Sequence, residues 1–140
     1  MTKKLSIPER LRRQVQERAQ GRCEYCLIHE SDMYYPHEAD HVIAEKHGGP
    51  TSLDNLAWAC IYCNRFKGSD LASVDPTSNK VVFLFHPREQ RWNRHFRLNG
   101  ALIGGITSSG RATVALLHFN DAERVAYRLG LIDIGHYPAR

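Results

Sequence analysis

The spacing of apolar residues changes several times along the chain, and each change predicts a different element. Near the N-terminus, Leu11 and Val15 lie four positions apart among charged and amide side chains, as on one face of an amphipathic helix. Ser6 and Glu9 have the form of a capping box at its start, and Gly21 suits the position after its C-cap. The pattern therefore predicts a helix that ends just before the first cysteine.

The next segment combines two short apolar runs with a polar loop. Residues 33–42 are rich in aromatic and β-branched side chains and residues 56–59 form a second apolar run, so both are predicted to contain strands. Residues 45–55 contain a Gly-Gly-Pro sequence that predicts a loop. A helix is expected to begin near Tyr62. The predicted order is strand, loop, strand, helix.

The second half of the chain has a different pattern. Residues 80–85 form an apolar run that predicts a buried strand, and the Asn-Gly pair at 99–100 predicts a hairpin turn. Residues 109–117 are expected to be helical. A last helix is predicted to start from a capping box at residues 120–123 and to end at Gly130.

Composition narrows the class of protein. A chain of 140 residues suits one domain, so residues 1–140 are expected to form a single unit. The start lacks the apolar region of a signal peptide and no run approaches membrane-spanning length, so a cytoplasmic protein without a membrane partner is expected. With 19 Lys and Arg against 15 Asp and Glu, the net charge of +4 favours a polyanionic partner, but only weakly.

The four cysteines of the chain form two pairs with the same C-x2-C spacing. The pairs are Cys23 with Cys26 and Cys60 with Cys63. Each turn holds two thiolates close together, and two such turns complete a tetrahedral Zn2+ site without an open position. Disulfides suit secreted chains, so a zinc site is the expected arrangement in a reducing compartment. Such a zinc is structural, and any chemistry must lie between the pairs.

The order of motifs in residues 21–68 resembles the HNH branch of the His-Me finger (ββα-metal) endonucleases, in the version with four zinc-binding cysteines. The matching motifs, in chain order, are C-x2-C, Asp-His-Val-Ile, Gly-Gly, Asp-Asn-Leu and C-x2-C-Asn-x2-Lys. The resemblance implies an α+β fold, in which a structural zinc with four cysteine ligands holds together a ββα-metal core. An N-terminal helix and a C-terminal hairpin plus helices accompany this core.

The remaining residues 75–140 form an extension to this nuclease core. Residues 86–96 and 110–113 look like part of an extension that a group of bacterial HNH proteins carries. We expect the extension to complete the core, with a role in gripping DNA or in dimerisation as the alternatives. The protein is expected to be a monomer or a homodimer.

Phosphodiester hydrolysis requires a base for the attacking water and a cation that neutralises charge on the phosphate. A histidine titrates near neutral pH, so His41 is the candidate base, as the resemblance also implies. Its alternative roles are structuring a loop and joining the zinc shell. Asp40 and Asn64 offer oxygen ligands for Mg2+ or Mn2+, and by the resemblance they hold the catalytic ion. The last letter of the motif is often His, so Asn64 departs from the commonest pattern, and helix capping is its alternative role.

Three more residues are expected to support this chemistry. Asn55 matches the middle Asn of the motif and is expected to brace the loop so that His41 keeps its orientation, with an Asx-turn as the alternative. Arg65 and Lys67 are candidates for substrate binding through the phosphate, unless they only lie on a solvated helix face.

The predicted function is metal-dependent hydrolysis of DNA phosphodiester bonds, with a structural Zn2+ and a catalytic Mg2+ or Mn2+. The resemblance implies products with 5′-phosphate and 3′-hydroxyl ends. DNA binding is expected to depend on backbone contacts with weak sequence preference, because no helix-turn-helix or finger array is evident. The alternatives are a zinc-knuckle binding module without catalysis, and a nuclease acting on RNA or on structured DNA.

Overall fold

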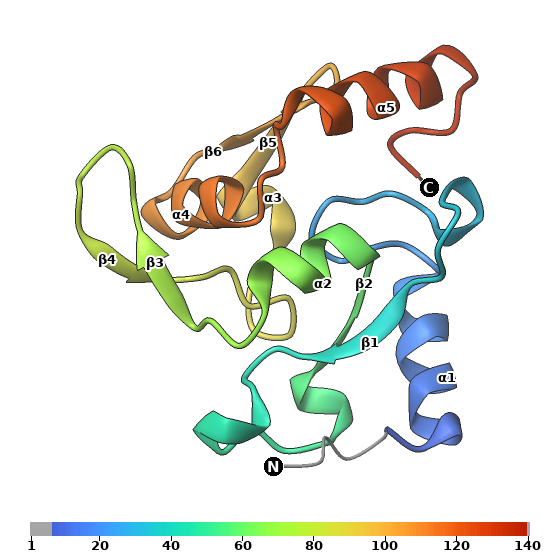
Figure 1. Ribbon diagram of the computed structural model, residues 1–140, viewed down its shortest axis with the longest axis vertical. Coiled ribbons are helices and arrows are strands. Elements are labelled where there is room, and N and C mark those ends of the chain that lie inside the picture. Colours follow the sequence, from blue (N-terminus) through green and yellow to red (C-terminus); the bar gives the residue numbers. More distant parts are fainter. Residues whose placement is uncertain (1–6, 140) are drawn as a thin grey trace.

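The computed structural model describes residues 7–139, which form an α+β fold, the class predicted from the sequence (Figure 1). The helices are α1 (Glu9–Ala19), α2 (Ile61–Lys67), α3 (Trp92–His95), α4 (Ser108–Leu116) and α5 (Ala122–Asp133). The strands form antiparallel pairs: β1 (Glu38–His41) with β2 (Leu56–Ala59), β3 (Ala72–Val74) with β4 (Val81–Phe83), and β5 (Phe96–Asn99) with β6 (Leu102–Gly105). Within the described part of the chain, no helix has the length and apolar character needed to span a bilayer.

The β1–β2 pair and α2 form the unit that was predicted as strand, loop, strand and helix. The register places Asp40 opposite Ala57 and His41 opposite Leu56. α1 packs against both strands and α2 packs against β1, so both helices contact this small sheet (Figure 1). The connecting loop contains two short 3-10 helices, η2 (Glu45–His47) and η3 (Leu53–Asn55).

The predicted N-terminal helix is confirmed as α1. Val15 is fully buried in a small cluster with Leu56 and Trp58 of β2. The C-cap residue Gln20 has a left-handed conformation and Gly21 follows it with φ +73°, as the C-terminal glycine signal predicts. The predicted capping box includes Ser6, which lies outside the described residues, and the N-cap residue is Pro8.

A larger hydrophobic cluster joins the cysteine region to the second half of the chain. It contains all four cysteines together with Phe85, Phe96, Ile103, Leu117 and Phe119, among others. The rings of Phe85 and Phe96 meet edge to face with centroids 5.1 Å apart. The cysteine-containing segment and the C-terminal segment therefore bury apolar surface against each other.

Residues 110–113 attach α4 to its neighbours. Gly110 lies so close to α3 that a Cβ atom there would be 2.1 Å from the carbonyl oxygen of His95. Arg111 forms two 2.9 Å hydrogen bonds with the buried carboxylate of Asp75, next to β3. Thr113 accepts a 2.9 Å hydrogen bond from the backbone N–H of Phe85. Gly110, Arg111 and Thr113 thus each make a tertiary contact.

The predicted buried strand at residues 80–85 is only partly correct. β4 covers its first half and pairs with β3, and its side chains Val81 and Phe83 are 72% and 75% exposed. Burial begins after the strand, at Leu84 and Phe85. An apolar run alone does not distinguish a buried strand from a two-stranded ribbon with one face in solvent.

The predicted β5–β6 hairpin is confirmed, but both predicted ends of the last helix are wrong. Asn120 does not cap α5, because its side chain bonds both backbone polar groups of Ile103, at 2.9 and 2.8 Å. The helix also continues through Gly130 to Asp133, and Gly135 follows its C-cap with φ +76°. Tertiary pairing of Asn120 therefore outweighs its capping preference.

Replacing Gly130 with Ala should raise the free energy of unfolding by about 0.5–1 kcal/mol, because alanine favours helix interiors. The site is exposed and an added Cβ would meet no atom within 4 Å. Denaturant titration measures the change. Gly135→Ala is the contrast, since its positive φ makes alanine unfavourable there; a comparable loss of stability in both variants would contradict a helix running through Gly130.

Candidate metal centre and nuclease site

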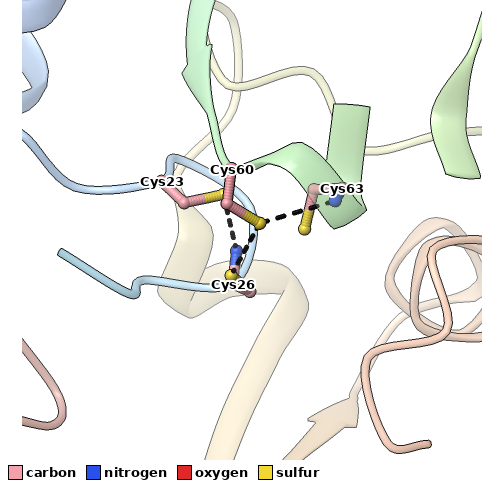
Figure 2. Close-up of side chains that lie close together, drawn as sticks. All are labelled: Cys23, Cys26, Cys60 and Cys63. Atoms are coloured by element: carbon pink, nitrogen blue, oxygen red, sulfur yellow. Dashed lines mark hydrogen bonds between the residues drawn. The ribbon is translucent and has the colours of Figure 1, made fainter. Parts of the chain in front are cut away.

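The four cysteines converge from two turns of the chain, as predicted (Figure 2). All four are fully buried, and their Sγ atoms all lie within 4.8 Å of one another. The first pair lies in the turn after α1, and the second pair lies at the start of α2, where Cys60 is the N-cap residue. Two tetrahedral ligands at the usual Zn–S distance would be about 3.8 Å apart. The 3.6 Å between Sγ of Cys26 and Cys60 is close to this value.

The donor set also fits zinc chemically. In each pair the backbone N–H of the second cysteine donates to Sγ of the first, at 3.4 Å in both turns. Burial raises the pKa of the Cys23 thiol and the pKa of the Cys63 thiol well above the usual value for cysteine. Zinc binding must therefore displace protons, so zinc affinity should fall as the pH falls.

His41 lies at the end of β1 and is held by the loop that follows it. Its ring is 4% exposed, and Nε2 is 2.8 Å from Oγ1 of Thr51 and 3.4 Å from Oε1 of Glu45. Neither partner was singled out from the sequence. The only available signal was weak: a carboxylate four residues after His41 and a hydroxyl just after the Gly-Gly-Pro turn.

The side chain of Asn55 closes this loop. Its Oδ1 accepts from the backbone N–H of Ile43 at 2.9 Å, and its Nδ2 donates to the carbonyls of Ile43 at 2.8 Å and Pro50 at 2.9 Å. The backbone carbonyl of Asn55 also accepts from Val42 at 2.8 Å. The side-chain bonds to Ile43 span 12 positions along the chain, so the alternative of a local Asx-turn is wrong.

Gly49 allows the loop to approach β1 closely. A Cβ atom at this position would lie 1.7 Å from the carbonyl oxygen of Ile43 and 2.8 Å from Nδ2 of Asn55. Only glycine fits such a close approach of two backbone segments. The second glycine of the Gly-Gly element is therefore explained by packing of the loop, whereas Gly48 has a positive φ of +86° and open space around it.

The oxygen-bearing side chains Glu38, Asp40 and Asn64 belong to β1 and the neighbouring α2. Glu38 and Asp40 are two residues apart in β1 and so point to the same face. Asn64 donates from Nδ2 to Oε2 of Glu38 at 3.2 Å. Helix α2 is capped by Cys60, whose side chain accepts from Cys63, so the capping alternative for Asn64 is wrong. This donor set suits a hard divalent cation such as Mg2+ or Mn2+.

Lys67 is buried rather than solvated. It is 2% exposed, and its Nζ donates to the carbonyls of Val42 at 2.7 Å and His41 at 3.5 Å. Burial lowers the pKa of Lys67 below its usual value, and the nearby Asp40 carboxylate partly opposes that shift. Of the two predicted phosphate contacts, only Arg65 lies on the exposed surface of α2.

The comparisons with known proteins agree with this geometry. Residues 23–70 match the family model described as HNH endonuclease, so this segment is an HNH domain. It begins at the first cysteine and contains both cysteine pairs, the β1–β2 pair and α2. No curated protein and no solved structure matches the chain. The domain indicates a nuclease.

Replacing any one of the four cysteines with Ser should release zinc and disorder the β1–β2 loop, because a closed four-thiolate site needs every ligand. Elemental analysis of the parent protein should find about one zinc per chain. Circular dichroism and elemental analysis of the variants measure both effects. A parent preparation that is fully folded without zinc would contradict the prediction.

Proposed function

We propose that the protein is a metal-dependent endonuclease that hydrolyses DNA phosphodiester bonds with His41 as the general base. The observation that carries the proposal is the fixed position of His41, buried at the end of β1 directly after Asp40 and with Nε2 2.8 Å from Oγ1 of Thr51, within an HNH domain. Asn55 and Lys67 bind the backbone of residues 41–43, where β1 ends, and so support the position of His41.

The contacts of His41 suggest which nitrogen accepts the proton. The carboxylate of Glu45 faces Nε2, which favours the tautomer with hydrogen on that atom. Nδ1 then keeps its lone pair and takes the proton of the attacking water. A carboxylate opposite the other nitrogen also stabilises the imidazolium that forms.

Asp40 and Asn64 would hold the catalytic Mg2+ or Mn2+ between β1 and α2. When bound, such an ion neutralises charge that develops on the phosphate and on the leaving oxygen. Arg65 is placed on the exposed side of α2 to contact a phosphate, whereas Lys67 supports the backbone from inside.

The charge distribution supports a nucleic-acid partner. Residues 90–120 contain four arginines and no Asp or Glu, so this segment accounts for the whole formal net charge of +4. Arg111 is paired with Asp75, but Arg91, Arg94 and Arg97 are exposed, and within residues 7–139 they form no ion pair. We propose that these three arginines, one at the N-cap of α3, one in α3 and one in β5, contact the DNA backbone.

The competing functions are a zinc-knuckle module that binds without cutting, and a nuclease for RNA or structured DNA. A pure binding module has no use for a buried histidine that directly follows a hard-metal ligand in the chain, which favours catalysis. Incubating the protein with supercoiled, linear and single-stranded DNA and with RNA, in Mg2+, Mn2+ or EDTA, separates these functions. Cleavage of DNA that EDTA abolishes is the expected result.

His41→Ala should keep zinc, fold and DNA affinity but lose at least about a hundredfold in cleavage rate, the usual lower contribution of a positioned base. Asp40→Ala should also lose activity, but its residual rate should rise with added Mn2+, because the defect is in metal occupancy. The cleavage rate of Asn55→Ala should lie between the rates of these two variants. Cleavage by His41→Ala at the parent rate would eliminate the HNH mechanism.

Arg94→Gln with Arg97→Gln should weaken DNA binding and reduce the slope of log affinity against log salt by about two, because two phosphate contacts are lost. The matched control is Arg10→Gln with Arg13→Gln, which removes the same charge from the exposed face of α1. Fluorescence anisotropy in the absence of divalent ions measures the DNA affinity of both double variants over a range of salt concentrations. Equal slopes for the two double variants would show that the α3–β5 arginines are not the DNA contact.

A further inference from the structure

A buried arginine of the last helix touches the cysteine cluster directly. Arg124 is 8% exposed, and its Nη2 donates to Sγ of Cys63 at 3.2 Å and lies 4.0 Å from Sγ of Cys60. We propose that Arg124 couples the zinc centre to the C-terminal segment, so that it retains the metal and the metal in turn holds α5 in place.

The charge of the centre supplies the first reason. Four thiolates around Zn2+ carry a net charge of −2, and a buried charge is costly unless it is paired or hydrogen-bonded. Within residues 7–139, no other charged side chain forms a hydrogen bond with a cysteine sulfur. Hydrogen bonds to metal-bound thiolates also stabilise the ligands in their charged form.

The place of Arg124 in its helix supplies the second reason. It lies in the first turn of α5, where the helix dipole disfavours a positive side chain. Burial adds a further cost for the guanidinium group. A negative centre in contact with the guanidinium group offsets both effects.

The other half of the guanidinium group binds the end of α4. Nη1 donates to the carbonyl of Leu117, the C-cap residue, at 2.6 Å and to that of His118 at 3.2 Å. The aromatic rings of Tyr62 and Phe119 have their centroids 5.6 and 5.8 Å from the guanidinium carbon. One side chain thus contacts α2, α4 and the cysteines.

The residues after α5 contact the first cysteine turn as well. The hydroxyl of Tyr137 donates to the carbonyl of Cys26 at 2.8 Å, and Nδ1 of His136 lies 2.8 Å from the carboxylate of Asp32. The C-terminal segment therefore approaches both cysteine pairs. Loss of zinc should loosen α5 along with the two turns.

The same helix provides a matched control. Arg128 is 0% exposed, and it donates to the carbonyls of Ala101 at 2.7 Å and Phe119 at 2.6 Å. It has no hydrogen bond to a cysteine sulfur within the described part of the chain. Both arginines are buried and donate to backbone carbonyls, but only Arg124 also donates to a cysteine sulfur.

The test compares zinc release from the purified, zinc-loaded variants Arg124→Met and Arg128→Met after addition of excess chelator. Arg124→Met should release zinc at least about tenfold faster than the parent, the usual effect of losing a partner of a metal ligand. Arg128→Met should lose thermal stability but, below its melting temperature, release zinc at the parent rate. If either Met variant fails to fold, Arg124→Lys and Arg128→Lys replace the pair, and only the first should release zinc faster.

Hydrogen exchange on the same zinc-loaded proteins tests the second half of the proposal. Amides in the first turns of α5 should exchange faster in the Arg124 variant than in the Arg128 variant. Equal zinc release from the two variants would overturn the role in metal retention, and unchanged exchange in α5 would overturn the docking role. Neither readout involves DNA, so failure of the proposed nuclease activity would leave this test unaffected.

Discussion

Four buried thiols that meet at one point are the constraint on which the rest of the structure depends. They connect the turn after α1 to the start of α2, and the β1–β2 pair with its loop lies between these two positions in the chain. A segment of this size has little apolar surface of its own, and the free energy of metal binding at the four thiols would add to the free energy of folding. The hydrophobic cluster around the cysteines then extends into the C-terminal half, so the metal site and the core are the same region of the protein.

The geometry of His41 follows from contacts made by other residues. Asn55 bonds the backbone at the start and in the middle of the loop, and Gly49 permits the close approach of these two segments. The buried ammonium group of Lys67 binds two carbonyls at the end of β1. These contacts use backbone groups, so they fix the position of the chain independently of any substrate. A base that is held before the substrate arrives loses less conformational entropy when it reacts.

The elements that were predicted correctly are those determined by neighbouring residues. The strand at residues 56–59, the hairpin turn at Asn99 and Gly100 and the two C-x2-C turns all depend on short-range signals. The exposure of Phe83, the pairing of Asn120 with Ile103 and the continuation of α5 past Gly130 depend on which distant segment packs alongside. These features could not be predicted from local patterns.

The same distinction applies to the site. The motif identified His41, Asn55 and the cysteines, because their order in the chain carries the signal. Glu45, Thr51 and Arg124 were missed, because only the fold brings the first two to His41 and the third to the cysteines. Arg124 is 61 residues from Cys63 in the sequence, and no spacing rule relates the two positions.

X-ray absorption at the zinc edge of the purified protein tests the central claim most directly. A closed structural centre requires one shell of four sulfur ligands at about 2.3 Å, with no nitrogen or oxygen ligand. The signal should stay the same when DNA or excess Mg2+ is added, since the centre has no open position. A shell containing a histidine nitrogen or a water oxygen, or a protein that folds without any zinc, would contradict the account.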